Sequence, residues 1–547
     1  MSAPKLKEWL SVGNRTNWVV FGLFTLMVFA KTLLFDHFAF REWNFEPSLL
    51  SMVYKLAAAM FFASFTFLLR DIRWLILLSV VIDTWFIANL VYMRNNHILL
   101  DGEAFNMAGN LHGYFWSVLI YIEWGIDLIF YGLTALFGWL IWLYQVIPAS
   151  RYPDRKNVLC FVLALVLGIC PLVCERTTHV YGQNFPKTVA TTSVLYAPYY
   201  IVADYRLMIA GIQPTRPMTE EDYAKADLLN AGQDSVQLDS PLIIVLLESL
   251  ENWVLTPEIM PNLWRLTQDD HVFYANRIHT QIVGAPSADG QMLVNTGLLP
   301  ITAGGTCLHY SHNTYPAIMK LAPDSAICLL PHDTCVWNQT AMSPAYGYDR
   351  TICYSDIDTI LFQKLDSLVD EGYKYIQCIT QSTHAPFVNE KYSRLELPKS
   401  MPWVMYNFIR GFNSLDEGLG YFIHKIETDP VLQNYTIVIT GDHRILHYEK
   451  RQQMQRYSDK HGMGLTPMDD CLPLIIRSPK ISGNPRYTDD AYQMDIYPTY
   501  RALVGAENCS WQGFGINLMD STQKRLITED EAYPLSDKLL RNNYFQR

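Results

Sequence analysis

The feature that most constrains how this chain folds is a series of long apolar stretches in its first third. A helix needs about 20 apolar residues to cross the roughly 30 Å of hydrocarbon in a bilayer. Five stretches reach or approach that length: Trp18–Phe35, Leu49–Leu69, Trp74–Met93, Tyr114–Tyr144 and Val158–Val173. We therefore expect residues 1–174 to form an all-α bundle of five transmembrane helices, with an interfacial turn inside the long fourth stretch.

Basic residues beside these stretches predict how the bundle is oriented, because cytoplasmic loops are enriched in Lys and Arg. Such residues precede the first stretch, separate the second from the third, and separate the fourth from the fifth; they are Lys5, Lys7, Arg15, Arg70, Arg73, Arg151, Arg155 and Lys156. With these loops inside and an odd number of spans, everything after about Cys174 lies outside. The sequence thus predicts a multi-pass protein of the cell (inner) membrane, with its C-terminal part on the periplasmic or extracellular side.

Five charged residues fall inside the apolar stretches or at their ends: Lys31, Lys55, Asp83, Glu123 and Asp127. Intramembrane charges often mark a functional site. Long charged side chains also extend to the interface, and opposite charges pair with each other. The sequence leaves both explanations open, and we assign no catalytic role to these residues.

The length of the chain predicts further structural units after the apolar stretches, and its charge excludes one class of partner. At 547 residues it exceeds what one hydrophobic core usually organises. Residues 175–240 mix apolar and charged patches, which predicts a juxtamembrane linker, and residues 241–547 then form an exported domain. The formal net charge of -11 argues against nucleic acid as a partner, since that partner requires a basic face.

Five cysteines of the exported domain have two interpretations. Cys307, Cys328, Cys335, Cys353 and Cys378 are spaced like disulfide partners of an exported protein. Sequence does not give their connectivity. Buried free thiols are an equal alternative.

From Pro241 onward, short β-branched runs alternate with polar, helix-like stretches, which predicts an α/β domain with a largely parallel sheet. Four runs end beside polar residues that can bind a metal or a phosphate. Leu242–Leu247 is followed by Glu248, Ala326–Leu330 by Pro331 and His332, Tyr375–Thr380 by His384 after a short gap, and Thr436–Thr440 by Gly441, Asp442 and His443.

These run ends are expected to converge, because ligands of open α/β sheets collect at the carboxyl ends of the strands. Two carboxylates and several imidazoles at one sheet edge predict a divalent-metal site. Taken singly, Glu248 also fits a helix N-terminus, where the macrodipole favours acids, and His384 fits an ordinary turn. The recurrence at four strand ends favours the metal site.

Seven short motifs add a family resemblance. They are LESLENW (247–253), MPNLWRL (260–266), GAPSADGQ (284–291), HNTYPAIMK (312–320), WNQ (337–339), GDH (441–443) and MDIYPTYRALVG (494–505). In this order and spacing, residues 241–518 resemble the lipoteichoic acid synthase branch of the sulfatase and alkaline phosphatase superfamily. The five preceding spans match that branch's architecture. The resemblance implies a sulfatase/alkaline phosphatase-like α/β domain and a phospholipid-headgroup phosphotransferase.

The resemblance also implies metal ligands and a nucleophile. Glu248, Asp442 and His443 would bind one divalent metal ion, and the nucleophile would complete the shell. The family's nucleophile is a threonine in a GKTSD-like motif, and Ser287 of GAPSAD occupies its place. Here Pro286 stands where relatives have a basic residue.

Substrate contacts follow from the same resemblance. His384 and Trp337 would contact the substrate phosphate or its headgroup, and Gln339, His332 and His461 are further candidates for substrate binding. Phosphoglycerol-transferring relatives have an arginine after Trp-Asn, where this chain has Gln339. That replacement puts the identity of the headgroup in doubt.

The implied chemistry depends on the metal, because a serine hydroxyl is a poor nucleophile near neutral pH and coordination lowers its pKa. The implied reaction moves an alcohol phosphate of the phosphoglycerol type from a phospholipid donor to a glycan, glycolipid or polymer acceptor, through a phospho-Ser287 intermediate. Manganese is the preferred ion, with zinc and magnesium as alternatives, since one acidic-plus-imidazole shell accommodates all three.

Three alternatives remain. A phosphoethanolamine transferase shares the spans, the metal and the nucleophile, and the glutamine at position 339 makes it a serious rival. A sulfatase needs a CxPxR-type motif, which is absent around Ser287. A catalytically silent scaffold with a degenerate sulfatase-like domain is the third alternative, and the retained metal-shell positions argue against it.

Overall fold

The computed structural model describes residues 12–41, 48–69, 71–96, 99–101, 104, 118–143, 155–174, 184–202, 217–232, 236–301, 304–322, 325–354, 358–388 and 391–546. They belong to two compact units, each considered by itself. One comprises Met1–Asn106 and Tyr121–Pro214, and the other Met107–Ile120 and Thr215–Arg547. The extent of the linker expected over 175–240 stays a prediction.

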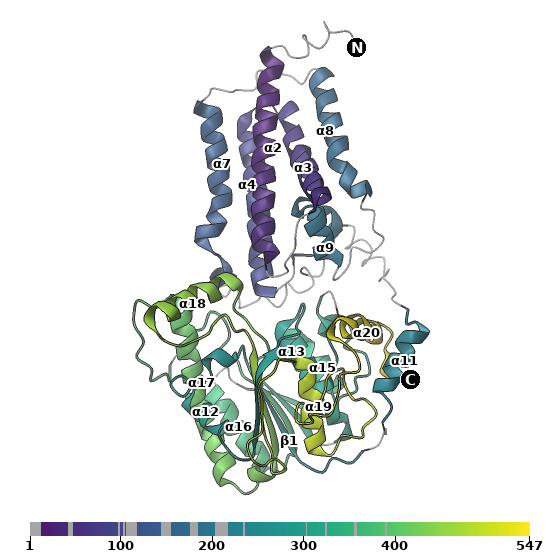
Figure 1. Cartoon of the computed structure of the whole chain (residues 1–547), viewed down its shortest axis with the longest axis vertical. Coiled ribbons are helices and arrows are strands. Elements are labelled where there is room, and N and C mark those ends of the chain that lie inside the picture. The colour runs from purple at the N-terminus through teal and green to yellow at the C-terminus, as the bar shows by residue number, and fades with distance from the viewer. Residues whose placement is uncertain are drawn as a thin grey trace. The chain divides into compact units, whose positions relative to one another are not determined.

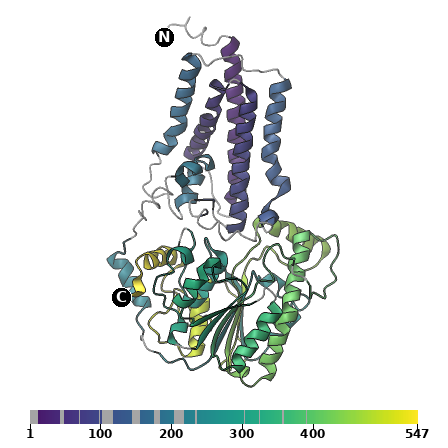
Figure 2. The ribbon, with the colours of Figure 1, turned by 180° about the vertical axis from the view of Figure 1, so that it is seen from behind.

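The first unit is a bundle of apolar helices, α2 (Val12–Ala39), α3 (Leu49–Ala63), α4 (Ile72–Asn96), α7 (Trp124–Leu143) and α8 (Arg155–Cys174), with the short α9 (Asn184–Thr191) beside them (Figures 1 and 2). Among the described residues, four segments are long and apolar enough to cross a membrane: Asn17–Ala39, Leu49–Phe67, Ile72–Asn96 and Trp124–Leu143. Asn157–Leu172 of α8 is a shorter apolar helix. The predicted all-α bundle of apolar helices is confirmed.

The fourth predicted span forms a shorter helix than its sequence stretch. A 3-10 turn at Leu119–Tyr121 precedes α7. Asp127 accepts a hydrogen bond from the Glu123 backbone N–H at 2.9 Å, which stabilises the first turn of the helix. Residues 114–117 lie outside the described residues, as do Lys5, Lys7, Arg70 and Arg151.

Most of the charged residues predicted inside the membrane are paired within the bundle. The pairs are Lys31 with Asp83 at 2.5 Å, Lys55 with Asp36 at 3.0 Å, and Arg94 with Asp127 at 2.9 Å. Lys31 also donates to Ser79 at 2.9 Å and to Thr134 at 2.5 Å. For these residues the structure shows mutual pairing within the bundle.

The second unit contains one mixed sheet of nine strands. Its order is β4 (Arg350–Cys353), β3 (Ala326–Leu330), β5 (Tyr375–Ile379), β1 (Leu242–Leu247), β6 (Thr436–Gly441), β7 (Leu472–Arg477), β2 (Val272–His279) and β8 (Arg486–Tyr487), with β9 (Ala491–Tyr492) also paired to β2. The first five are parallel, whereas β7 runs antiparallel to both β6 and β2. All four predicted strands are present, and the predicted α/β class is confirmed.

Helices cover both faces of this sheet, as Figures 1 and 2 show. On one side lie α12 (Pro261–Leu266), α16 (Asp358–Asp370) and α17 (Trp403–Thr428), and on the other α13 (Pro286–Thr296), α15 (Gln339–Ala345) and α19 (Ile496–Arg501). The remaining helices are α11 (Glu220–Leu229), α14 (Thr306–His309), α18 (Tyr448–His461) and α20 (Glu529–Arg541). Double coverage explains why every residue of β1 is buried and apolar.

The nine cysteines whose side chains the structure describes are free thiols. Cys307, Cys328 and Cys378 are buried, whereas Cys335 and Cys353 are exposed. Of the two interpretations of these five residues, the structure shows the free thiols.

Candidate active site

Glu248 is held at the carboxyl end of β1. Its backbone N–H donates to Thr380 Oγ1 at 2.9 Å, and its carbonyl accepts from Thr383 Oγ1 at 2.6 Å, which ties it to the end of β5. The next residue, Ser249, has a φ of 58° and donates from Oγ to Glu248 Oε1 at 2.6 Å. The chain turns sharply here, and the carboxylate is oriented as it leaves the strand.

Asp442 and His443 follow the neighbouring strand β6. A Cβ on Gly441 would lie 2.2 Å from the Leu250 carbonyl oxygen, so the turn requires glycine at this position. Asp442 Oδ1 accepts from the backbone N–H groups of Ser249 and His443, each at 2.8 Å. One carboxylate oxygen therefore joins the ends of β1 and β6.

Ser287 is the second residue of α13, in the turn of the helix where backbone N–H groups point outward. Asp289 Oδ2 accepts from the N–H groups of Val283, Gly284 and Ala285 at 2.9 to 3.1 Å, which shapes the preceding loop. A Cβ on Gly290 would lie 2.2 Å from the Asp442 carbonyl oxygen. This close approach brings the start of α13 to the turn that carries Asp442.

The four side chains converge. Ser287 Oγ lies 3.2 Å from His443 Nε2 and 3.5 Å from Glu248 Oε2. His443 Nε2 lies 3.4 Å from Glu248 Oε1 and 3.5 Å from Asp442 Oδ2. The other ring nitrogen, Nδ1, donates to the Arg444 carbonyl at 2.8 Å, so Nε2 is the atom that faces the cluster.

Burial and mutual charge shift the protonation of this cluster. Burial alone raises the pKa of Glu248, but the hydrogen bond and charge of His443 outweigh it and lower the pKa to about 2. Burial, followed by the charge of Glu248, raises the pKa of Asp442 to about 7. Burial lowers the pKa of His443, but the two carboxylates raise it to about 10. A positive charge between the carboxylates of Glu248 and Asp442 therefore stabilises the cluster.

The same atoms fit a divalent metal ion. Asp442 Oδ2 is buried and accepts no hydrogen bond from the residues that the structure describes, which is costly for a carboxylate oxygen unless a cation lies beside it. One ligand atom each from Glu248, Asp442 and His443 lies within 4.8 Å of the others. Two carboxylates, an imidazole and a hydroxyl form a donor set that suits manganese, zinc or magnesium.

Two predicted substrate-binding histidines lie near this cluster. His332 follows β3, and burial lowers its pKa while the charge of Glu248 opposes the shift. His384 is close enough that its charge acts on both Glu248 and His332. Its Nδ1 is within hydrogen-bonding distance, 2.7 Å, of the Ala385 carbonyl. Imidazoles near Ser287 can hydrogen-bond phosphoryl oxygens or move a proton.

The other predicted substrate-binding residues differ in position. Trp337 is half-buried and has a φ of 51°, an uncommon conformation for a bulky residue. Gln339 is buried, and its amide donates to Gln291 Oε1 of α13 at 2.6 Å, so it joins two helices. His461 is the exposed last residue of α18, and its ring contacts that of Tyr457 in a tilted arrangement with 4.2 Å between the ring centroids. No described contact connects Gln339 or His461 with Ser287.

Sequence reasoning missed the residues that position the cluster. Gln493 accepts from the Gln281 N–H at 2.8 Å and donates to the Asp442 carbonyl at 2.7 Å. Asp289 lies inside the GAPSADGQ motif, yet its hydrogen bonds to the preceding loop form only in the folded turn. Gln493 directly precedes the MDIYPT motif, and no local signal marks it.

Comparisons with known proteins agree on the family. Residues 2–191 match the lipoteichoic acid synthase N-terminal domain, and residues 308–506 match the sulfatase family. The chain is a lipoteichoic acid synthase-like member of the sulfatase and alkaline phosphatase superfamily. With its apolar N-terminal helices, it is a membrane-anchored protein.

Among its relatives is the lipoteichoic acid synthase-like YvgJ of Bacillus subtilis (strain 168), 26% identical over 362 residues that cover 59% of this chain and 57% of YvgJ. Lipoteichoic acid synthase 2 of the same strain is 23% identical over 56% of this chain and 52% of its own length. The chain thus spans a little over half the length of these relatives. The structure of lipoteichoic acid synthase LtaP from Listeria monocytogenes gives a TM-score of 0.47 at 21% identity, covering 62% of this chain and 97% of LtaP.

Proposed function

We propose that this lipoteichoic acid synthase-like protein transfers phosphoglycerol from a phospholipid to an acceptor outside the membrane, through a phospho-Ser287 intermediate. The observation that carries the proposal is the position of Ser287 Oγ, 3.2 Å from His443 Nε2 at the start of α13. The N-terminus of a helix favours a negatively charged oxygen or phosphate. The names of the relatives, which are lipoteichoic acid synthases, favour phosphoglycerol as the transferred group.

One divalent ion, preferably manganese, would be held by Glu248, Ser287, Asp442 and His443. When bound, it lowers the pKa of the serine hydroxyl and withdraws charge from phosphoryl oxygens. Glu248 and Asp442 are oriented for this role by bonds from Ser249 and the backbone. Zinc and magnesium are alternatives for the same donor set.

The reaction has two half-reactions. In the first, Ser287 Oγ releases its proton to solvent and forms a bond to phosphorus, while the bond from phosphorus to the diacylglycerol oxygen breaks. His384 or His332 gives a proton to the departing diacylglycerol alcohol. In the second, an acceptor hydroxyl gives up its proton to that histidine and attacks phosphorus, and the Ser287 oxygen leaves and takes a proton back from solvent. The acceptor is a glycan, glycolipid or growing polymer.

A second candidate is transfer of phosphoethanolamine. The observation that favours it is the buried position of Gln339, whose amide is engaged with Gln291 and Ser343 at 2.6 and 3.0 Å. An uncharged amide held inside the fold supplies no cation at the place where phosphoglycerol-transferring relatives have an arginine. The chemistry at Ser287 is the same for both headgroups.

We place the catalytic domain outside a multi-pass membrane bundle. The basic loops of the sequence support this orientation. Covalent attachment to membrane helices keeps the domain at high effective concentration near a lipid donor. The proposal therefore also explains why a phosphotransferase domain is joined to a membrane bundle.

The deciding experiment incubates full-length protein in lipid vesicles with labelled phosphatidylglycerol or phosphatidylethanolamine and manganese. We expect release of diacylglycerol and an adduct of glycerol phosphate mass on the peptide that carries Ser287. The Ser287→Ala variant should lose both signals by at least about 10³-fold, as for loss of a nucleophile. An ethanolamine phosphate adduct would support the second candidate, and undiminished turnover by Ser287→Ala would reject the covalent mechanism.

A further inference from the structure

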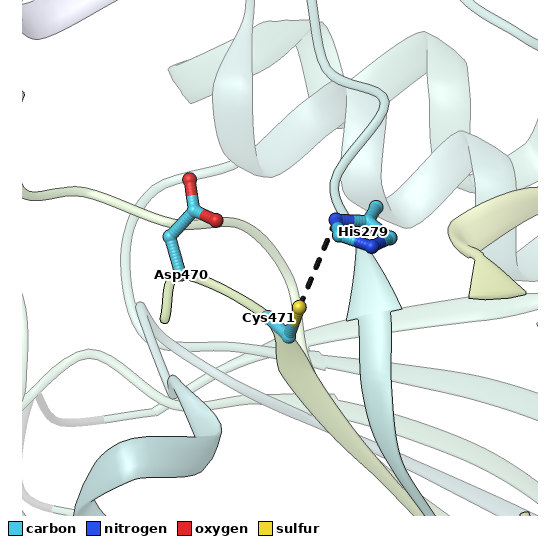
Figure 3. A group of neighbouring side chains, drawn as sticks. All are labelled: His279, Asp470 and Cys471. Atoms are coloured by element: carbon cyan, nitrogen blue, oxygen red, sulfur yellow. Dashed lines mark hydrogen bonds between the residues drawn. The ribbon is translucent and has the colours of Figure 1, made fainter. Parts of the chain in front are cut away.

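A second cluster of metal-binding side chains stands at the end of β2 and directly before β7, and it shares no residue with the cluster at Ser287. Ile278 of β2 is the cross-strand partner of Leu472 of β7 in an antiparallel pair. His279 and Cys471, the next residue in each direction, therefore lie opposite each other, where side chains share one face. Figure 3 shows the imidazole and the thiol facing one another, with the Asp470 carboxylate beside them.

The distances suit tetrahedral zinc. Cys471 Sγ lies 3.7 Å from His279 Nδ1. Tetrahedral bonds of about 2.3 Å to sulfur and 2.0–2.1 Å to nitrogen place those two atoms about 3.6 Å apart. One ligand atom each from His279, Asp470 and Cys471 lies within 4.8 Å of the others. The side chain of Asp470 is 28% exposed, and its Oδ2 is paired with Arg444, which leaves Oδ1 as the oxygen for a shared ion.

The imidazole is already oriented for coordination. His279 Nε2 lies 2.8 Å from Asp490 Oδ1, and Arg277 holds that same oxygen with bonds of 2.9 and 2.6 Å. When Nε2 carries the proton that binds Asp490, Nδ1 presents its lone pair to Cys471. Histidine ligands of zinc typically donate their second N–H to a carboxylate in this way.

The exposure of the side chains and the chemistry of the ligands also suit a zinc site. Cys471 is 1% exposed, whereas the side chain of His279 is 37% exposed, so the cluster has a buried thiol on one side and solvent on the other. A thiolate and an imidazole select zinc over magnesium or manganese. Three protein ligands with an open fourth position match zinc sites that retain a water molecule.

We propose that His279, Asp470 and Cys471 form a second, zinc-type metal site at this edge of the sheet. On binding, the Cys471 thiol releases its proton, sulfur coordinates as thiolate, and water fills the fourth position. The site is chemically distinct from the cluster at Ser287, which has no sulfur ligand. It depends on neither the proposed reaction nor its substrate.

Cobalt(II) titration of the full-length protein in detergent tests this assignment. The protein is first treated with reductant and chelator. Thiolate coordination produces a sulfur-to-cobalt charge-transfer band in the near ultraviolet, which oxygen and nitrogen ligands do not give. We expect added cobalt to produce the band in the wild type, with an amplitude at saturation that corresponds to one thiolate site per chain, and zinc to abolish it by displacement. Absence of the band at saturating cobalt would overturn the proposal.

Variants assign the band to these residues. Cys471→Ser should lose it completely, and Asp490→Asn should keep it with an affinity about 10–100-fold weaker, as is usual for an outer partner of a histidine ligand. His279→Asn, at a half-exposed position that leaves the fold intact, should weaken cobalt binding by at least about tenfold. The control, Cys335→Ser with Cys353→Ser, removes the two exposed thiols of the second unit and should keep the band. Circular dichroism verifies that Cys471→Ser is folded. Persistence of the band in the folded variant would overturn the proposal.

Discussion

Asp289 shows how one buried carboxylate positions a nucleophile that it does not touch. Its Oδ2 accepts three backbone N–H groups from the loop that leads into α13. In Asp289→Ala these groups lose their acceptor, and each buried unpaired group costs about 1–3 kcal/mol. The loop then relaxes and displaces Ser287. We expect kcat to fall about 10²-fold, as for a displacement near 1 Å.

Asp289→Asn is the matched control for this change. The amide keeps one oxygen that accepts from the same loop, so its kcat should stay within about tenfold of the wild type. Diacylglycerol release from labelled phospholipid measures both variants, and manganese content shows whether the metal site survives. An alanine variant with wild-type kcat would show that the loop does not position Ser287.

At the scale of elements, the start of α20 depends on a capping box. Thr528 N and Oγ1 donate to Glu531 Oε2 at 3.1 and 2.9 Å, and Lys225 of α11 pairs with Glu531 at 3.1 Å. The backbone bond from Thr528, followed by its hydroxyl and by Lys225, lowers the pKa of Glu531 to about 2. A lowered carboxyl pKa stabilises the folded state above the unfolded pKa, and this stabilisation is lost as pH falls through the folded pKa.

Glu531→Gln should therefore lower the melting temperature at pH 7 by on the order of 2 °C. The difference from wild type should shrink as the pH falls from about 4.5 toward 2. Fluorescence-monitored unfolding across this range measures it. Asp530→Asn, which removes the same charge from the neighbouring exposed residue, is the control and should show a smaller difference. If the melting-temperature difference between Glu531→Gln and the wild type stayed constant with pH, the lowered pKa of Glu531 would not be the source of the stabilisation.

The helices of the membrane bundle are joined by buried ion pairs, of which Lys31 with Asp83 is the most enclosed. Removing one partner leaves an uncompensated buried charge, which costs about 3–5 kcal/mol. Lys31→Met should thus destabilise the bundle strongly. Lys31→Met with Asp83→Leu removes both charges and should recover most of that loss.

Unfolding in detergent measures stability for these two variants, and labelled-lipid turnover measures activity. A structural pair predicts that stability and activity are lost in the single variant and recovered together in the double variant. If the double variant were stable but inactive, the pair would have a function beyond packing. This comparison separates the two explanations that the sequence left open.

For the whole molecule, the sequence predicted those features whose positions follow from local pattern. Glu248, Asp442 and His443 come directly after buried strand runs, and parallel strands bring their carboxyl ends to one edge. The apolar stretches likewise predicted the membrane bundle, because hydrocarbon thickness sets helix length.

What the sequence did not reveal depends on pairing between distant segments. His279 and Cys471 are opposite each other only because β2 runs antiparallel to β7, whereas the sequence predicted a largely parallel sheet. Gln339 occupies a position expected to face substrate, yet its amide is satisfied by Gln291 of another helix. Neither relationship leaves a local pattern, since each is fixed by packing of elements far apart in the chain.

Membrane orientation is the property of the whole molecule that labelling can test most directly. If the second unit lies outside the membrane, its exposed thiols Cys335 and Cys353 face the exterior of an intact cell. A membrane-impermeant maleimide, added to intact cells after mild reduction, should label the protein about as fully as it does after permeabilisation. The basic loops beside the apolar helices are the physical reason for this orientation.

The control variant carries Cys335→Ser and Cys353→Ser and should lose most of the labelling, because the buried thiols Cys307, Cys328 and Cys378 are shielded in the folded domain. Cys170 is exposed on the apolar helix α8, and if that helix lies in the membrane, lipid shields its thiol from a polar reagent. Labelling that appears only after permeabilisation would place the domain in the cytoplasm. That outcome would also remove Ser287 from any acceptor outside the membrane.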